Sequence, residues 1–256
     1  MSAEQSLQTL PSKFTDWFAS RGWAAREHQL DCLAASQEGL SWLLIAPTGG
    51  GKTLAGFLPS LVALDGRETP DEGRLHTIYI SPLKALAVDV ARNVGAPVEE
   101  MGLDLLIETR TGDTPAVRRQ RQKYQPPDIL MTTPESLSLL IASPDAAQYF
   151  KGLKRIILDE LHALIPNKRG HLLSLALARL RALAPEVRLC GLSATVPDAR
   201  PLIDYLTPQN TDAASAKLIR GKAGAKPQVD VMMSEDSIPW SGHSGKHSFM
   251  EVYEQI

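Results

Sequence analysis

Residues 46–53 read APTGGGKT and combine three consecutive glycines with a lysine and a threonine. Glycines let backbone N–H groups turn inward around phosphate oxygens, because no Cβ obstructs the turn. Lys52 is predicted to reach the β- and γ-phosphates of a nucleoside triphosphate, and Thr53 to offer its hydroxyl to Mg²⁺. Ala46 stands where the first glycine of such loops is usual. The residues predicted to bind the nucleotide are Pro47, Thr48, Gly49, Gly50, Gly51, Lys52 and Thr53.

Two further polar segments, DELH at 159–162 and SAT at 193–195, follow short apolar runs. Asp159 is predicted to hold Mg²⁺ through water, and Glu160 to polarise the attacking water. His162 is expected to bond either the γ-phosphate or the SAT segment. Ser193 and Thr195 are expected to bond the DELH carboxylates and to couple the nucleotide site to the opposite face, although a capped turn also explains SAT alone. The predicted catalytic residues are Lys52, Asp159, Glu160 and His162, and the predicted metal ligands are Thr53 and Asp159.

Short apolar strands that alternate with helices must position these residues. Such alternation predicts an α/β fold, with a mostly parallel sheet covered by helices on both faces. Ligands bind such sheets at the carboxyl ends of the strands, where the motifs lie. Helix 170–184 is predicted to be apolar on most of its surface and well buried. The expected strands are 42–46, 76–80, 104–109, 128–132, 154–158 and 187–192, and the expected helices are 53–64, 83–101, 115–123, 134–142, 170–184 and 198–206.

The ordered motifs resemble those of a known family. APTGGGKT, SPLKALA (81–87), RTGDT (110–114), TTPESL (132–137), DELH and LSAT resemble motifs I, Ia, Ic, Ib, II and III of superfamily 2 helicases. The run DELHALIPNKRGHLLSLALARLRAL is similar to the large helicase-related (Lhr) group. ISPLKALAVDVARN and IETRTGDTPAVRRQRQ look most like its ligase-associated DEXH-box branch in bacteria. The resemblance covers roughly residues 20–206.

The resemblance implies a RecA-like phosphate-loop domain that uses ATP and Mg²⁺. It also implies 3′→5′ translocation on DNA, with duplex unwinding in DNA repair in a bacterial cytoplasm. The expected partner is single-stranded DNA or a duplex with a single-stranded tail, and a DNA ligase and a nuclease are expected functional neighbours. The expected domains are a helical lead-in with the adenine-recognition segment (1–40), the first RecA-like domain (41–233) and a linker toward a second one (234–256).

Motifs Ia, Ib and Ic are expected to contact the nucleic-acid backbone, because hydroxyls, backbone N–H groups and a few cations suit phosphate oxygens. Thr133 and Pro134 would equally serve as the N-cap and first residue of a helix. The basic run at 118–123 is either a DNA-facing patch or, as we favour, a solvated helix face. The predicted nucleic-acid contacts are Ser81, Pro82, Leu83, Lys84, Arg110, Thr111, Gly112, Thr132, Thr133, Pro134, Lys168 and Arg169.

Gln29 lies where the resembled helicases have an adenine-recognising glutamine. A side-chain amide can bond both N6 and N7 of adenine, which would favour ATP over GTP. The alternative for Gln29 is a polar position on the outer face of a helix at 26–36.

Composition sets limits on the function. The chain has 256 residues and a net charge of −2, so any nucleic-acid surface must be local. Cys32 and Cys190 lie in apolar patterns and are expected to be reduced core residues of a cytosolic protein. No apolar run approaches the ~18 residues of a membrane span, and no membrane partner is expected.

After residue 206 most residues are small or polar and are interspersed with glycine and proline, and one possible strand lies at 229–233. His243 and His247 lie among glycines, which favours a linker over a metal site. By analogy with the family we expect one RecA-like domain without its partner. Such a chain should bind ATP but hydrolyse it poorly, because the second domain supplies arginine fingers.

Three other functions remain open at this level. A DExH RNA helicase would share these motifs, because phosphate-gripping residues do not distinguish the sugars. A phosphate-loop kinase or small NTPase would need no SPLKALA, TTPESL and SAT series. A non-catalytic nucleotide-gated binding module would not need Lys52, Asp159 and Glu160.

Overall fold

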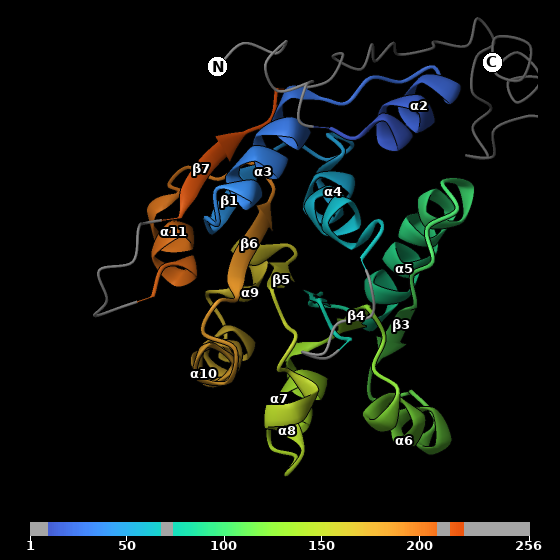
Figure 1. The fold of residues 1–256 in the computed structure, drawn as a ribbon. Helices are drawn as coiled ribbons and strands as arrows, with labels where there is room; N and C mark the ends of the chain where they lie inside the picture. The colour runs from blue at the N-terminus through green and yellow to red at the C-terminus, as the bar shows by residue number, and fades with distance from the viewer. Residues whose placement is uncertain (1–9, 68–73, 209–215, 223–256) are drawn as a thin grey trace, which may run out of the picture. The chain divides into compact units, whose positions relative to one another are not determined.

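A computed structural model describes residues 10–67, 74–208 and 216–222 (Figure 1). Seven parallel strands form one sheet in the order β3-β4-β2-β5-β6-β1-β7. The predicted α/β fold with a parallel sheet is confirmed. The strands are β1 (Trp42–Ile45), β2 (Thr77–Ile80), β3 (Ile107–Arg110), β4 (Ile129–Thr132), β5 (Arg155–Leu158), β6 (Arg188–Ser193) and β7 (Lys217–Arg220).

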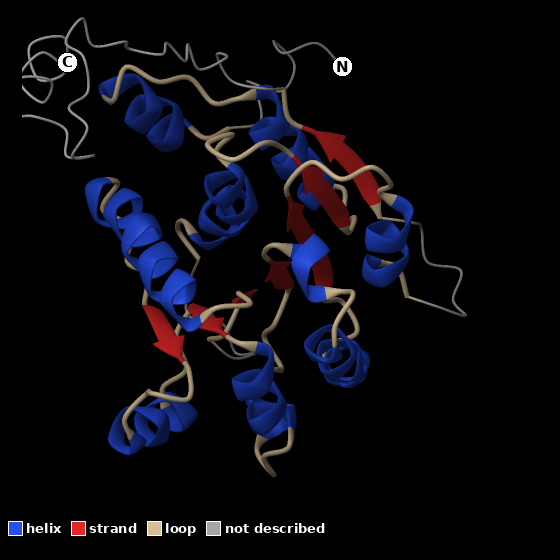
Figure 2. Cartoon of the chain, turned by 180° about the vertical axis from the view of Figure 1, so that it is seen from behind, coloured by secondary structure: helices blue, strands red, loops and turns tan. Residues whose placement is uncertain are grey.

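Helices connect the strands and cover both faces of the sheet (Figure 2). They are α2 (Ser12–Ser20), α3 (Glu27–Gln37), α4 (Lys52–Leu64), α5 (Lys84–Glu100), α6 (Ala116–Tyr124), α7 (Pro134–Ile141), α8 (Ala146–Tyr149), α9 (Leu161–Leu164), α10 (Lys168–Leu183) and α11 (Arg200–Leu206). No helix in these ranges is long and apolar enough to cross a bilayer. The possible strand at 229–233, the linker at 234–256 and the two tail histidines lie outside the described residues.

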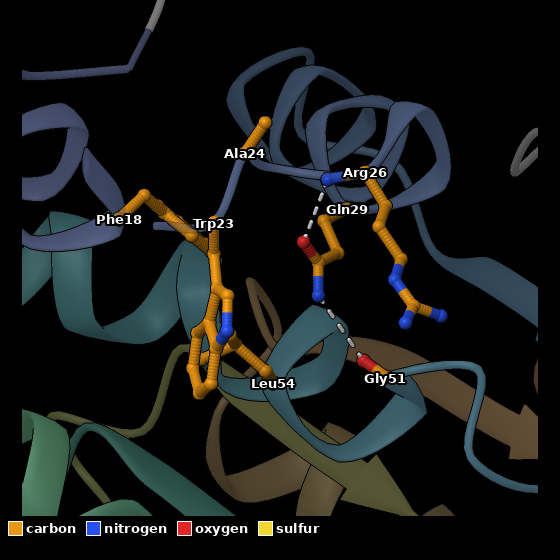
Figure 3. A pocket seen from close by; sticks show the side chains of 7 residues that line it. All are labelled: Phe18, Trp23, Ala24, Arg26, Gln29, Gly51 and Leu54. Atoms are coloured by element: carbon orange, nitrogen blue, oxygen red, sulfur yellow. Dashed lines mark hydrogen bonds between the residues drawn. The ribbon is translucent and has the colours of Figure 1, made fainter. Parts of the chain in front are cut away.

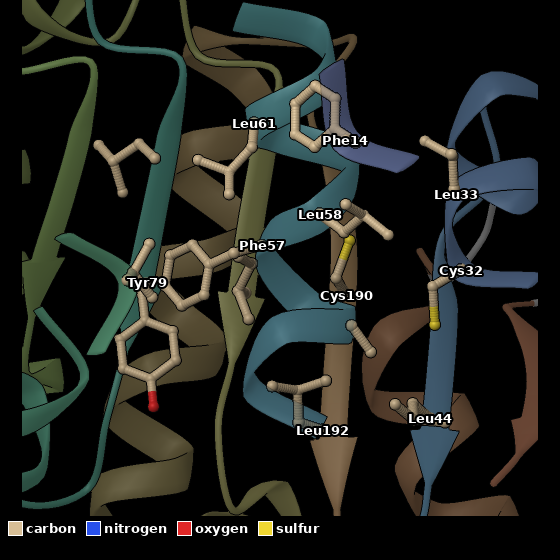
Figure 4. Close-up of a cluster of buried hydrophobic side chains, with 14 of the residues drawn as sticks. Phe14, Cys32, Leu33, Leu44, Phe57, Leu58, Leu61, Tyr79, Cys190 and Leu192 are labelled. Carbon is tan, nitrogen blue, oxygen red and sulfur yellow. The ribbon is translucent and has the colours of Figure 1, made fainter. Parts of the chain in front are cut away.

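Alternate residues of the strands feed two hydrophobic clusters, one on each face of the sheet. Leu44 belongs to the cluster under α2, α3, α4 and α5, which Figure 4 shows around Phe57 and Tyr79. Its neighbour Leu43 belongs to the cluster under α7, α9, α10 and α11. All four residues of β1, β2, β4 and β5 are buried, as expected for parallel strands covered on both sides.

The helical lead-in is part of this core. Phe14 of α2 and Leu33 of α3 are fully buried in the same cluster as α4. Gly39 follows the end of α3 in the left-handed region at φ +70°, a conformation that glycine adopts readily after a helix. Cys32 and Cys190 are both free and buried, and burial raises the pKa of the Cys190 thiol to about 12.

The sequence prediction was wrong for α10 and missed β7. One face of α10 packs inward through Leu173, Leu177 and Leu180, whereas Leu175 is 72% exposed. As an outer-layer helix, α10 has a single inner surface to cover, so its extra leucines remain outside. Strand β7 pairs with β1 at the sheet edge and buries only Ile219, and it therefore lacks the apolar run that marks the other strands.

Candidate functional site

The loop between β1 and α4 needs glycine at all three central positions. Gly49 and Gly51 have φ angles of +73° and +76°, in the left-handed region. A Cβ added to Gly50 would lie 2.7 Å from the carbonyl oxygen of Pro47. The Lys52 Nζ donates hydrogen bonds to the carbonyls of Ala46 (3.0 Å) and Pro47 (3.1 Å), so its ammonium group curls back over the loop.

Side chains at the start of α3 engage successive carbonyls of this loop. Arg26 Nη1 donates to Gly49 O (3.3 Å), His28 Nε2 to Gly50 O (2.9 Å) and Gln29 Nε2 to Gly51 O (3.4 Å). Burial lowers the pKa of His28, which favours the neutral ring with its proton on Nε2. The C=O and N–H of one trans peptide unit point in opposite directions.

The N–H groups of Gly51 and Lys52 therefore point away from α3, and they are free to face an anion at the start of α4.

Asp159 follows β5 and is buried at the middle of the sheet edge. The Tyr79 hydroxyl from β2 donates a hydrogen bond to its Oδ2, and the Glu160 backbone N–H donates to Oδ1 at 2.9 Å. Burial raises the pKa of Asp159, and the Tyr79 hydrogen bond and the charge of Lys52 oppose that rise. Asp159 offers a carboxylate after β5, and Thr53 offers a hydroxyl in the first turn of α4; both are the oxygen ligands that Mg²⁺ prefers. The donor set thus fits the predicted metal.

Glu160 has a left-handed backbone at φ 46°, the one positive φ outside glycine among the described residues. Such strain persists where the surroundings enforce it, often at functional sites. His162 Nδ1 lies 3.5 Å from Glu160 Oε2 and 3.1 Å from Ser193 Oγ. Ser193 Oγ also donates to Ala194 O (2.9 Å), and in that arrangement it accepts a hydrogen bond from the Nδ1–H tautomer of His162.

The contact between the DELH and SAT segments therefore differs from the expectation. Ser193 bonds the imidazole of His162 instead of a carboxylate, and Thr195 is exposed. Of the two partners foreseen for His162, the structure shows the SAT segment.

The strand order divides the motifs between two halves of one sheet edge. SPLKALA, RTGDT and TTPESL follow the neighbouring strands β2, β3 and β4. DELH, SAT and the glycine loop follow β5, β6 and β1. The two sets meet where β2 pairs with β5, which is where Tyr79 contacts Asp159.

Several predicted nucleic-acid residues are engaged inside the protein. Ser81 and Thr132 are fully buried, and Thr132 Oγ1 donates to Arg110 O at 2.7 Å. Arg110 Nη1 donates to Arg119 O at 3.0 Å. Thr133 caps α7 by accepting the Ser136 N–H, which is the capping role that its sequence context allowed.

The remaining predicted contacts are divided between exposed, ion-paired and partly buried residues. Leu83 is 57% exposed, and Lys84 Nζ contacts both oxygens of Asp113 at 2.9 and 3.0 Å. Lys168 is exposed, whereas Arg169 pairs with Glu135. Gly112 is exposed, Pro82 is half-buried, and Thr111 and Pro134 are buried.

The basic run lies on α6. Arg118 and Lys123 are exposed there, while Arg121 pairs with Glu108. Such exposure is common to both alternatives for this run, a solvated helix face and a DNA-facing patch.

A cavity of about 320 Å³ opens beside Gly51 and is shown in Figure 3. Gln29 is buried at its wall, and the Arg26 N–H donates to Gln29 Oε1 at 2.9 Å. Its lining residues are Phe18, Trp23, Ala24, Arg26, Gln29, Gly51 and Leu54.

Gln29 was among the residues predicted from sequence, whereas Trp23 was not; Trp23 is 55% exposed and has the Arg21 guanidinium 5.6 Å from its ring centroid. A tryptophan in an amphipathic segment is typical of a core position, and only the structure shows that the ring of Trp23 is exposed at this cavity.

Comparison with known proteins supports the interpretation of the chain as a helicase domain. Residues 26–202 match the family model described as DEAD/DEAH box helicase. The chain is 36% identical over 223 residues to the ATP-dependent helicase Lhr-Core of Methanocaldococcus jannaschii, an alignment that covers 82% of this chain and 26% of that relative. It is 41% identical over 220 residues to the Lhr helicase/uracil glycosylase of Escherichia coli, covering 77% of this chain and 14% of that protein.

Solved structures agree. The structure of Mycobacterium smegmatis helicase Lhr bound to ssDNA and AMP-PNP aligns with a TM-score of 0.75 and 36% identity. That alignment covers 86% of this chain and 28% of the solved chain. The chain thus spans between 14% and 28% of the length of these Lhr proteins, and the predicted resemblance to helicases of the Lhr group is confirmed. With its family model spanning most of the described sheet, the chain belongs to the DEAD/DEAH box helicase family.

Proposed function

We propose that this chain is the ATP-binding motor domain of an Lhr-type DNA helicase, which binds Mg-ATP and the backbone of single-stranded DNA. The division of the motifs between β5, β6 and β1 on one side and β2, β3 and β4 on the other carries the proposal. Such a division suits a protein that binds the phosphates of a nucleotide at one half of the sheet edge and a second ligand, here DNA, at the other half. The Mycobacterium smegmatis Lhr structure, which holds both AMP-PNP and ssDNA, supports this assignment.

At the nucleotide half, Lys52 supplies positive charge to the β- and γ-phosphates once it exchanges its carbonyl partners for phosphate oxygens. Thr53 and Asp159 would hold Mg²⁺, which neutralises charge that develops on the phosphates. Glu160 orients the attacking water and accepts its proton. His162 holds Glu160 toward the SAT segment through its contact with Ser193.

The cavity beside Gly51 is our candidate adenine site. Gln29 already uses one acceptor position for Arg26 N–H and one donor for Gly51 O. A glutamine amide has two of each, so one acceptor and one donor remain. These match the N6–H donor and N7 acceptor of adenine, whereas guanine presents acceptors at both O6 and N7. The exposed ring of Trp23 offers a stacking surface.

Exposed Leu83, Lys84 and Gly112 at the other half, together with exposed Lys168 at the start of α10, form the surface that would meet DNA. Salt dependence of binding to labelled oligodeoxythymidine tests this, because each phosphate-contacting cation adds about 0.7 to the slope of log K against log salt for a single strand. We expect affinity to fall as salt rises. Salt-independent binding, or none, would refute the proposal.

Oligouridine in the same assay separates DNA from RNA. Preference for oligouridine would favour the DExH RNA helicase alternative, because 2′-OH contacts mark RNA readers. The plant DExH RNA helicase similarity, 31% identity over 171 residues, makes this control necessary. Phosphorylation of a small acceptor would point instead to a kinase.

The finer functions rest on the family resemblance. We propose 3′→5′ translocation with duplex unwinding in DNA repair, in a bacterial cytoplasm and beside a DNA ligase and a nuclease. We also propose that this chain alone binds Mg-ATP but turns it over slowly. In the resembled helicases a second RecA-like domain supplies the arginine fingers, which contribute a factor of about 10³–10⁵ to the rate of hydrolysis. Rapid turnover by the pure chain would contradict that last point.

A further inference from the structure

Arg169 lies at the start of α10, shortly after the DELH segment. The Asn167 side chain caps this helix by accepting the N–H groups of Arg169 (2.9 Å) and Gly170 (3.2 Å). Gly170 is packed so tightly that an added Cβ would lie 2.3 Å from Leu164 O. The backbone that carries Arg169 is therefore fixed from both sides.

The Arg169 guanidinium reaches two other loops at once. Its Nε donates to Glu135 Oε1 at 2.5 Å and its Nη2 to Oε2 at 3.0 Å, which is a bidentate pair. Its Nη1 donates to the carbonyl of Pro82. Glu135 lies in the first turn of α7, after β4, and Pro82 follows β2. Helices α7 and α10 lie side by side in both views (Figures 1 and 2).

We infer that Arg169 is a positioning residue that ties the loops after β2 and β4 to the helix that follows DELH. This differs from the direct phosphate contact expected from its sequence, and it rests on the proposed DNA binding. The pair with Glu135 lowers the pKa of that carboxyl, so both partners stay charged. Together they are neutral and add little net attraction for phosphate. Their contribution to binding comes from holding the SPLKALA and TTPESL loops at one spacing.

Glu135→Gln separates this role from simple electrostatics, because the two predict opposite signs. Removing a negative charge near DNA should tighten binding if long-range charge alone matters. Losing the bidentate pair frees the two loops, and we expect affinity for oligodeoxythymidine to fall roughly fivefold.

Arg169→Ala and Lys168→Ala form a matched pair of neighbouring charge removals. Lys168→Ala should lower affinity and also reduce the salt slope by roughly 0.7, as a lost phosphate contact does. Arg169→Ala should lower affinity at least as much while the salt slope stays unchanged. In Glu135→Gln/Arg169→Ala the two losses should not add, because each breaks the same contact.

The outcomes distinguish this inference from the function on which it rests. Wild-type protein that shows no salt-dependent binding to oligodeoxythymidine would refute both. Salt-dependent wild-type binding with equal or tighter binding by Glu135→Gln would refute the inference alone, as would a reduced salt slope in Arg169→Ala. If Arg169→Ala does not fold, as judged by circular dichroism, the isosteric Glu135→Gln still decides.

Discussion

Gln29→Glu is the sharpest perturbation of the candidate adenine site. Glutamate keeps the oxygen that accepts the Arg26 N–H, and Glu at this position completes a capping box as well as Gln does. The substitution removes both N–H donors, one that reaches Gly51 O and one that is spare. The start of α3 should therefore survive while recognition of adenine N7 is lost.

The size of the effect follows from the geometry. Gln29 is only 3% exposed, so adenine N7 would face a carboxylate with little water to replace the lost donor. An unsatisfied buried partner costs about 1–3 kcal/mol, or roughly 5- to 150-fold in the dissociation constant of ATP.

Competition against a fluorescent ATP analogue, in the presence of Mg²⁺, measures this loss. Gln37→Glu is the matched control, because Gln37 is exposed at the far end of α3. Mg-tripolyphosphate is the second control, since it has phosphates and no base. We expect its affinity to fall less than that of ATP in Gln29→Glu, because the added carboxylate repels both ligands whereas the lost base contact affects ATP alone.

Two results would refute the reasoning. Wild-type affinity for ATP in Gln29→Glu would remove Gln29 from adenine recognition. An equal loss for ATP and tripolyphosphate would show that the side chain only supports the phosphate loop through Gly51.

Three further predictions concern other buried contacts. Tyr79→Phe removes the hydroxyl that orients Asp159, and we expect the Mg²⁺ concentration for half-maximal nucleotide binding to rise roughly tenfold. Gly170→Ala forces a Cβ against Leu164 O, which should lower the free energy of unfolding by about 1–3 kcal/mol in denaturant titrations. Burial and the nearby Arg155 lower the pKa of His76 from 6.5 to about 3, so its stabilising contribution is complete above pH 6.5 and is lost as pH falls toward 3. The wild-type free energy of unfolding should drop by about 2 kcal/mol between pH 7 and 5 from this group, and His76→Gln should flatten that dependence.

Each of these has a result that contradicts it. An unchanged Mg²⁺ dependence in Tyr79→Phe would mean that Asp159 needs no help from β2. Gly95→Ala, in α5 where a Cβ meets nothing within 4 Å, should be neutral or stabilising. If Gly170→Ala resembles it, the close packing is not a constraint. The same acid dependence in His76→Gln and wild type would assign the titration to other groups.

The sequence predicted the sheet well because its central strands are buried on both faces and so appear as continuous apolar runs. Motifs at the ends of such strands must share one edge, which is why the candidate nucleotide residues could be expected to lie along a single edge of the sheet. Strand β7 was missed because an edge strand that buries only Ile219 has no such run. The burial of α10 was overestimated because leucine content does not reveal how many faces a helix covers.

Side-chain partners were the least predictable part of the site. The local sequence predicts that Arg169 is an unpaired cation, because its partners Pro82 and Glu135 lie 87 and 34 residues away in sequence. Tyr79 reads as an ordinary strand residue, and only the pairing of β2 with β5 brings it to Asp159. Such contacts depend on strand order, which local patterns do not specify.

Calorimetric titration of Mg–AMP-PNP into wild-type protein and Lys52→Ala tests the central claim most directly. We expect one nucleotide bound per wild-type chain, and affinity reduced at least tenfold in Lys52→Ala, since the ammonium supplies the main positive charge to the β- and γ-phosphates. Thermal unfolding without nucleotide should be alike in both proteins. No binding by folded wild-type protein, or equal binding by both, would contradict the assignment of residues 46–53 as the nucleotide cradle of a helicase motor.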